Sequence, residues 1–324
     1  MRPRWLLPAL LTFIFLVSLA VHHFELLDLY IQLILMYVGI NIILTLSLNL
    51  INGYMGEFSV GHAGFMAIGA YIASLLTVKI FPAYMTAWLF PLAVLAGGIG
   101  AALVGLIVAF PSFKTRGDYL AIVTLAFGMI VKSAIENIDA LGGPRGFLGM
   151  EKLSTLPWVF FWAALSVWVI RNLVYSNFGR GVISIREDEI ASDLMSVNTK
   201  EVKIIAFVVS SFFAGVAGAL FAHLLQFINP RAFDIIKSTD ILIMVYLGGI
   251  GSIAGSILGA TIYTVLLEVL RPMGIWRMVF MPLMLVLLMI FRPKGIMGLK
   301  EFRWFVPIRD LFASRLWHYK RGEK

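Results

Sequence analysis

The most informative set of charged side chains in the sequence lies in a polar loop between residues 171 and 203. The loop is too polar to enter lipid and too long for a tight turn. Its five basic and five acidic side chains cancel, so the loop is neutral overall. These charged residues are Arg171, Arg180, Arg186, Lys200 and Lys203, with Glu187, Asp188, Glu189, Asp193 and Glu201.

Part of this loop has the pattern of a short amphipathic helix. Acidic residues occupy the opening turn of the segment from Glu187 to Leu194, where a helix N-terminus favours them. Ile190, Leu194 and Val197 follow at the i, i+4 and i+7 spacing of one helix face. The pattern predicts a helix whose apolar stripe needs a partner. That partner is either another protein or, alternatively, the chain's own transmembrane bundle or the lipid headgroups.

A second group of candidates consists of polar residues inside apolar segments, where burial in lipid is costly. Asn49, Ser59 and His62 flank a glycine-rich break, and His223 and Gln226 lie within one turn near the end of a segment. These five are the candidates to line a translocation pathway, although an interhelical hydrogen bond or an interfacial position is the simpler explanation of each one taken alone. The other residues of this kind are Gln32, Asn41, Glu136 and Glu268.

The sequence lacks the common motifs of catalysis. It contains no Gly-x-x-x-x-Gly-Lys-Ser/Thr phosphate loop, no His-Glu-x-x-His metal pair and no Gly-x-Ser-x-Gly nucleophile turn. It also has no cysteine, which excludes disulfides and thiolate metal sites. We therefore expect a protein that is not an enzyme, holds no metal and binds no cofactor of its own.

Composition indicates a polytopic membrane protein. The 324 residues are 60% hydrophobic and 14% charged, against about 25% charged in a soluble domain. Apolar runs long enough to cross a hydrocarbon core of about 30 Å recur along the chain, and in lipid they must be helices. The fold class is therefore all-α, a transmembrane helical bundle. The candidate spans are 5–21, 26–50, 59–79, 86–110, 119–135, 155–171, 203–227, 240–270 and 276–291.

The distribution of Lys and Arg predicts that both ends are cytoplasmic. Residues 292–324 carry nine basic and three acidic side chains, a net charge of +6, and Arg2 and Arg4 precede the first span. A single span over 240–270 would put the basic end outside. We therefore expect two shorter elements, hinged at Gly248, Gly249 and Gly251, and about ten crossings, within a range of eight to ten.

Two further boundaries follow from the pattern. We expect residues 1–300 to form a transmembrane domain with its polar loop at about 172–202, and residues 301–324 to form a basic cytoplasmic tail. Residues 1–20 also resemble a cleavable signal peptide, but the many later spans favour an uncleaved first span.

Glycine-interrupted segments occur in both halves, at 53–64 and 248–255, as in structural repeats around a central pathway.

The polar loop resembles the EAA-type coupling loop of ABC import permeases, in the form found in the branched-chain amino acid family. The resemblance rests on Gly179 to Asn198, and Ser196 stands where a glycine is usual. In that family the loop docks on the ATPase subunit. The coupling residues that the resemblance implies are Arg186, Glu187, Asp188, Glu189, Ala191, Leu194 and Ser196.

Other stretches match the same family in the same order, over residues 45 to 300. Residues 49–71 resemble its glycine-rich segment before the third span, with Glu57 where an uncharged residue is common. The stretches 142–146, 240–251 and 292–295 also fit. The match is with the M-type membrane subunit of the high-affinity importer.

The resemblance implies an importer subunit that works by alternating access in the bacterial cytoplasmic membrane. Its partners would be two ATPase subunits that use ATP, a second homologous permease, an extracytoplasmic solute-binding protein and membrane lipid, without nucleic acid. The implied substrate is a branched-chain or related neutral amino acid. Urea and short amides, which related permeases carry, stay open, and an ion-coupled secondary transporter is a more distant alternative.

Overall fold

The computed structural model describes residues 6–24, 27–82, 84–113, 119–291, 295–298 and 301–302. Its α-helices are α1 (Leu6–His23), α2 (Leu29–Asn49), α3 (His62–Leu75), α4 (Thr86–Ser112), α5 (Tyr119–Glu136), α6 (Leu156–Val174), α7 (Asn177–Glu187), α8 (Glu189–Leu194), α9 (Thr199–Leu225), α10 (Ile235–Gly248), α11 (Ile253–Val269) and α12 (Arg277–Phe291). The shorter elements are the π-helices η1 (Leu50–Met55) and η2 (Leu76–Ile80), the 3₁₀ turns η3 (Asp139–Leu141), η4 (Gly143–Arg145), η5 (Pro230–Phe233) and η6 (Arg271–Trp276), and the strands β1 (Phe147–Leu148) and β2 (Phe227–Ile228).

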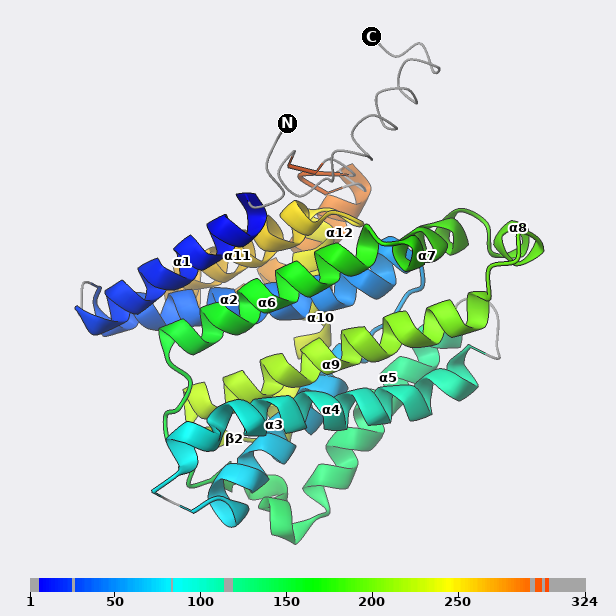
Figure 1. The fold of residues 1–324 in the computed structure, drawn as a ribbon. Coiled ribbons are helices and arrows are strands. Elements are labelled where there is room, and N and C mark those ends of the chain that lie inside the picture. Colours follow the sequence, from blue (N-terminus) through cyan, green and yellow to red (C-terminus); the bar gives the residue numbers. More distant parts are fainter. Residues whose placement is uncertain are drawn as a thin grey trace.

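The all-α, membrane-spanning fold class is confirmed. Within the described residues, six helices are long and apolar enough to cross a membrane by length and composition. They are α2 continued by η1, α3 continued by η2, α4, α5, α6 and α9. Together with α1, α10, α11 and α12 they correspond in position to the ten predicted crossings. Figure 1 shows most of these helices gathered in one bundle.

The predicted split of the 240–270 segment is present in the structure. α10 ends at Gly248 and α11 begins at Ile253, and Gly249 and Gly251 between them have positive φ angles of 132° and 76°. Such angles favour glycine because it has no Cβ. The basic residues used for the orientation, Arg2, Arg4 and most of the C-terminal tail, lie outside the described residues.

Local sequence sets where the helices of the polar region begin. The Ser176 hydroxyl accepts a bond from the Gly179 amide at 3.1 Å and caps α7. The Asn198 side chain caps α9 in the same way. These side chains satisfy amides that have no partner within the helix, so each helix starts at a defined residue.

The centre of the bundle is a close packing of α3, α4 and α9. A Cβ built on Gly69 of α3 would lie 2.1 Å from the Gly215 carbonyl oxygen of α9, and one on Gly218 would lie 1.9 Å from the Met66 carbonyl oxygen. Gly97 of α4 approaches Gly69 similarly. Small residues therefore allow backbone contact where lipid supplies no hydrophobic drive for association.

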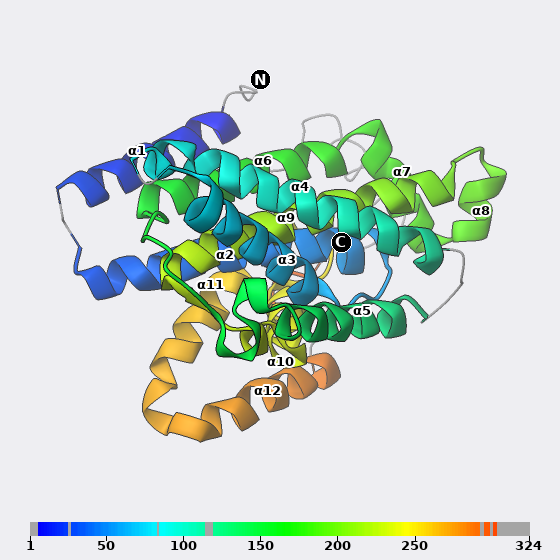
Figure 2. The same cartoon turned by 90° about the horizontal axis from the view of Figure 1, so that it is seen from below.

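Two loops far apart in sequence meet at the end of the bundle opposite to α7 and α8. β1 and β2 pair antiparallel, with Phe147 opposite Ile228 and Leu148 opposite Phe227. Figure 1 shows β2 at the end of the bundle away from α8, and Figure 2, which views the molecule from below, shows α8 at one end of the bundle. The strand pair joins the loop before α6 to the loop before α10.

The packing of α9 against α3 generates a first prediction. Gly218→Ala introduces a Cβ that must displace the Met66 backbone, so we expect a loss of about 2 kcal/mol in the free energy of unfolding. Thermal unfolding of the purified protein in detergent measures the loss. Gly128→Ala is the matched control because a Cβ there has nothing within 4 Å. Equal stability of the two variants would contradict the prediction.

Candidate coupling site

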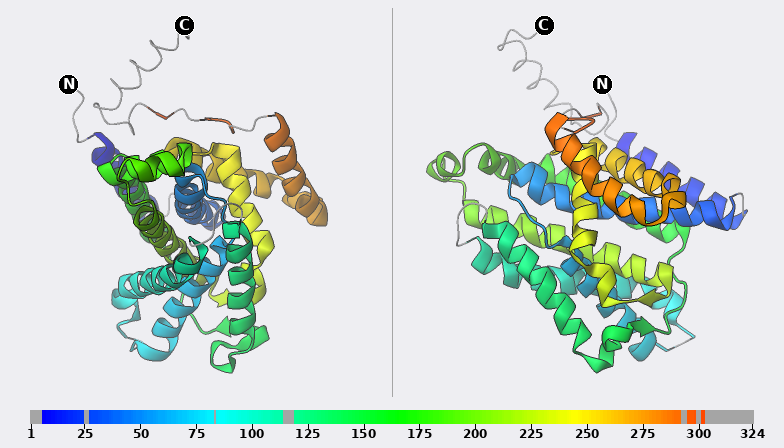
Figure 3. Two further views of the ribbon diagram at one scale, coloured as in Figure 1. Left: turned by 90° about the vertical axis from the view of Figure 1, so that its right-hand side faces the viewer. Right: turned by 180° about the vertical axis from the view of Figure 1, so that it is seen from behind.

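The polar loop folds into two helices rather than the one predicted. α7 ends at Glu187, and Asp188, in an extended conformation, accepts the Ala191 amide at 2.9 Å and caps α8. The expected helix over 187–194 is therefore wrong at its start, because Asp188 ends one helix and caps the next. Val197 lies beyond α8 and does not extend its stripe. Figure 1 shows α7 and α8 projecting from one end of the bundle, and Figure 3 shows them from two further sides.

α8 presents an apolar surface with acidic neighbours. Ile190 is 63% exposed and Leu194 is 81% exposed, and Met195 just after the helix is equally open. Glu187 and Asp193 are also exposed. Ile190 and Leu194 therefore do not pack on the chain's own bundle. Another protein and the lipid headgroups remain as partners for these two side chains.

The helices α7 and α8 together form a polar hairpin, and a buried lysine connects this hairpin to the membrane-spanning helices. Lys203, in the first turns of α9, has a side chain only 7% exposed. Its Nζ lies 2.5 Å from the Glu57 carboxylate and 2.8 Å from the Glu189 carboxylate. Glu57 belongs to the glycine-rich segment between η1 and α3, and Glu189 is the first residue of α8. One ammonium group thus joins three segments, and its burial requires both carboxylates.

Arg186 makes a second link at the end of α7. Its Nη1 donates to the Gly53 carbonyl oxygen in η1 at 3.1 Å, and its Nη2 pairs with Glu187 at 2.7 Å. Gly56, with a φ of 79°, lies against the Arg186 side chain. A Cβ added to Gly56 would be 2.6 Å from the Arg186 Cγ. The polar hairpin therefore rests directly on the glycine-rich break.

That break is itself joined to the break between α10 and α11. The Asn49 side chain accepts the Gly251 amide at 2.9 Å and donates to the Ser252 carbonyl at 3.0 Å and to the Ser256 hydroxyl at 2.7 Å. An added Cβ at Gly53 would lie 2.4 Å from the Gly251 nitrogen. The two glycine-interrupted segments noted in the sequence are thus in contact. A π-helix such as η1 often marks a functional site.

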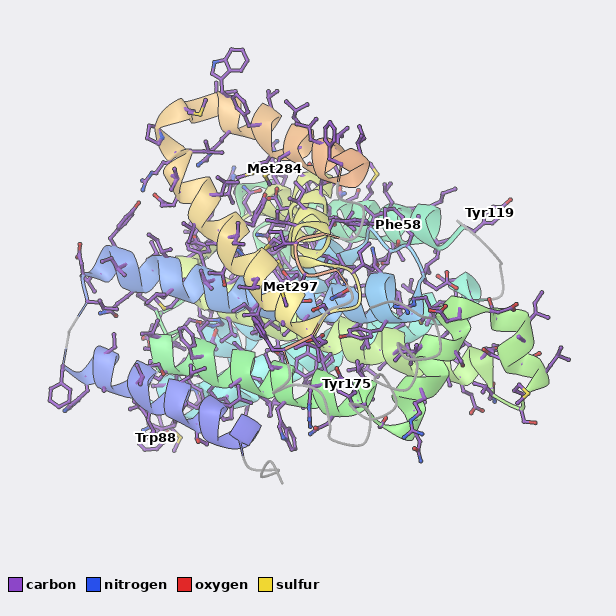
Figure 4. All side chains as sticks on the ribbon, turned by 90° about the horizontal axis from the view of Figure 1, so that it is seen from above. Phe58, Trp88, Tyr119, Tyr175, Met284 and Met297 are labelled. Carbon is purple, nitrogen blue, oxygen red and sulfur yellow. The ribbon has the colours of Figure 1, made fainter. Side chains whose placement is uncertain are left out.

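The segment after α12 forms hydrogen bonds to the end of α10, next to the break between α10 and α11. The Ile296 and Met297 amides each donate at 3.0 Å, to the Leu247 and Gly248 carbonyls. Figure 4 shows Met297 near the junction of α10 and α11, apart from Met284 on α12. Glu301 accepts bonds from the Ile253 and Ala254 amides at the start of α11, and burial raises the pKa of its carboxyl group.

Known proteins resemble this chain over most of its length. The family described as "Branched-chain amino acid transport system / permease component" matches residues 30–291. The high-affinity branched-chain amino acid transport system permease protein LivM of Escherichia coli is 34% identical over 293 residues, covering 80% of this chain and 68% of LivM. The chain belongs to the branched-chain amino acid transport permease family.

More distant members of this family also align. The probable branched-chain amino acid transport permease protein LivM of Methanocaldococcus jannaschii is 26% identical over 82% of this chain and 92% of its own length. The permease protein LivH of Escherichia coli is 24% identical over 80% of this chain and 91% of its own length. No solved structure matches the chain significantly. The family resemblance seen in the sequence is confirmed.

The structure brings some of the expected pathway residues together. Ser59 and His62 are unexposed beside the glycine-rich break, where the Ser59 amide donates to the Asn52 side chain at 3.2 Å and His62 Nε2 pairs with the Ser47 hydroxyl at 2.8 Å. Within the described residues, the Ser59 hydroxyl and His62 Nδ1 have no hydrogen-bond partner. Their pathway role stays a prediction.

His223 and Gln226, expected to act together, have different surroundings. His223 is fully buried in α9, where its nitrogens pair with the Thr77 hydroxyl and the Ala219 carbonyl at 2.9 Å and its ring packs on Phe90. Gln226 is exposed and ends α9 with a φ of 61°. His223 has the contacts of a core residue in this conformation, and neither residue's role in a pathway is tested.

Sequence reasoning listed Lys203 only among the charges of the polar loop, noted Glu57 as a departure from the family pattern, and did not select Glu301. One signal was available, because Lys203 stands at the start of a predicted span and a charge there needs a nearby partner. The identity of its partners depends on contacts across 146 positions of the chain for Glu57 and 14 for Glu189. Spacing within one helix does not reveal such contacts.

The lysine contacts generate a second prediction. Lys203→Met leaves two carboxylates facing each other without a cation, so we expect a loss of about 3 kcal/mol in the free energy of unfolding, with the partly exposed Glu189 limiting the cost. Thermal unfolding measures this loss. Lys200→Met, an exposed lysine on the same loop, should have little effect. Adding Glu57→Gln should restore part of the loss, and a further loss would count against the ion pairs.

The turn after α8 gives a third prediction. Ser196 adopts a left-handed φ of 64°, at the position where the family commonly has glycine. A side chain in this conformation costs about 1 kcal/mol relative to glycine. Ser196→Gly should therefore raise the melting temperature slightly, whereas Ser192→Gly, within the helical turns of α8, should lower it. A destabilised Ser196→Gly variant would contradict this assignment.

Proposed function

We propose that this chain is a membrane-spanning permease subunit of an ATP-driven importer of branched-chain amino acids. The observation that carries the proposal is the α7–α8 hairpin, which offers an exposed apolar surface and is tied to the membrane bundle through the buried Lys203. The printed names of the similar LivM and LivH proteins supply the substrate class. The chain itself is not an enzyme, and ATP is bound and hydrolysed by partner subunits.

The proposed mechanism is alternating access driven from the hairpin. Each ATPase subunit of a pair grips the α8 of one permease, and its closure displaces that helix. The movement passes through Lys203 to Glu57 and through Arg186 to Gly53, and so reaches η1. From η1 it reaches the α10–α11 break through Asn49. A change at both breaks switches the side to which the pathway opens.

The remaining partners follow from the same proposal. A second permease, as LivM and LivH imply by belonging to one named transport system, forms the pathway together with this chain. A solute-binding protein delivers the amino acid from outside. The complex lies in the cytoplasmic membrane of a bacterium, with both termini inside, in agreement with the net charge of +6 over residues 292–324.

An experiment on the α8 surface tests the proposal. Ile190→Asp with Leu194→Asp places charge on the two exposed apolar side chains without touching the Asp188 cap. If α8 contacts the ATPase, we expect at least a tenfold drop in ATPase capture by the tagged permease, which corresponds to about 1.4 kcal/mol. Leucine uptake into proteoliposomes that contain the complete complex should fall in parallel.

The matched control changes an exposed apolar residue at the opposite end. Leu148→Asp, on β1, should leave ATPase capture unchanged. Undiminished capture by the α8 variant would refute the coupling role. Uptake of leucine by the parent permease in vesicles without any ATPase would refute the ATP-driven mechanism, and uptake of urea or short amides in place of leucine would refute the substrate class.

A further inference from the structure

A groove of about 510 Å³ lies between α2, α10, α11 and α12. This volume is within the range of about 300–1,000 Å³ that is usual for small-molecule sites. The groove is distinct from the coupling site, because its walls come from the halves of these helices near η6. In Figures 2 and 3, α12 stands away from the bundle and is joined to α11 by η6.

One wall of the groove carries an unpaired cation. Lys237, in the first turn of α10, lines the groove, and its Nζ lies 5.6 Å from the centre of the Phe221 ring. Within the described residues, no carboxylate lies within ion-pair distance of Lys237, and Asp240, one turn further along α10, attracts it over a longer distance. An ammonium group in a membrane protein is costly unless it faces a partner or a water-filled path. This one therefore has capacity for an anionic ligand.

An acid one turn further along the same helix lines the same groove. The carboxylate of Asp240 accepts a hydrogen bond from the Tyr263 hydroxyl on α11, which holds it in place. In the part of the chain that the structure describes, no cation lies within ion-pair distance of Asp240, and the attraction between Asp240 and Lys237 acts over a longer distance. The groove therefore presents a fixed positive and a fixed negative group, separated by one helical turn.

The other charges of the groove are arranged differently. Glu268 and Arg277 lie toward η6, where Glu268 accepts from Tyr30 and pairs with Arg271 at 3.0 Å. The rest of the lining is mostly apolar or internally bonded. Ile236, Leu267 and Met281 provide aliphatic surface, and the Asn41 amide donates to the Thr264 hydroxyl at 2.9 Å. An apolar surface thus lies next to the two unpaired charges.

We propose that this groove is a binding subsite for a zwitterionic α-amino acid with an apolar side chain. The carboxylate of the ligand binds Lys237, its ammonium group binds Asp240, and its side chain packs on the aliphatic wall. A ligand with both charges satisfies both protein groups at once, whereas a ligand with one charge leaves the other group unpaired. This inference rests on the proposed function and adds to it a place where this chain holds its substrate.

The absence of cysteine from the sequence permits a direct test. Thr239 lines the groove between the two charged residues, so Thr239→Cys introduces a unique thiol beside the subsite. The full complex, assembled with cysteine-free partners, is treated with a small maleimide in the presence or absence of leucine. We expect saturating leucine to slow the labelling at least fivefold. Ser133→Cys, exposed on α5 and outside the groove, is the control and should label at one rate throughout.

Ligand analogues and charge variants separate the two ionic contacts. Leucinol lacks the carboxylate and 4-methylpentanoate lacks the ammonium group, so neither should protect the thiol at concentrations where leucine does. Lys237→Gln should make leucinol as effective as leucine, and Asp240→Asn should do the same for 4-methylpentanoate. If Lys237 and Asp240 only stabilised the fold, one substitution would not favour leucinol while the other favoured 4-methylpentanoate.

The possible failures are distinguishable. If the complex takes up leucine with ATP but leucine leaves the labelling rate at position 239 unchanged, the groove is not a substrate site and the inference is overturned. Equal protection by leucine and leucinol in the parent complex would likewise overturn it. If the parent complex fails to take up any branched-chain amino acid, the proposed function fails instead. Ile236→Cys serves as the probe should Thr239→Cys prevent uptake.

Discussion

The arrangement of this protein depends on the need to satisfy broken backbone inside a membrane bundle. Lipid offers no hydrogen bonds, so an interrupted helix is stable only where other protein groups pair with its free amides and carbonyls. Asn49 does this for the break between α10 and α11, from the end of α2. The consequence is that the two interrupted segments, about 200 positions apart, are held as one unit and cannot change conformation independently.

The polar hairpin is attached to this unit by charged contacts as well as by the buried Val182 and Ile185 of α7. Lys203 and Arg186 reach the glycine-rich segment from α9 and α7, while α8 turns its apolar residues outward. This arrangement suits the proposed role of α8 as the part of the chain that an ATPase subunit grips.

Much of the fold could be predicted from the sequence, because helices in lipid need long apolar runs and because charge sets their direction. The split at Gly248 followed from that reasoning alone and is present in the structure. The predicted start of the helix over 187–194 was wrong. The Asp188 side chain caps the helix and so sets its first residue, whereas apolar periodicity gives no information about caps. The partners of Lys203 could not be foreseen, because they depend on how distant segments pack.

The short pairing of β1 with β2 has a consequence for how the outer surface can vary. The two strands are joined through backbone atoms, with Phe147 opposite Ile228, so the junction makes little demand on the side chains that face away from the bundle. Leu148 and Phe227 are exposed there. Mutations at these two positions can therefore change the surface at this end of the bundle while the backbone pairing keeps the two loops in register.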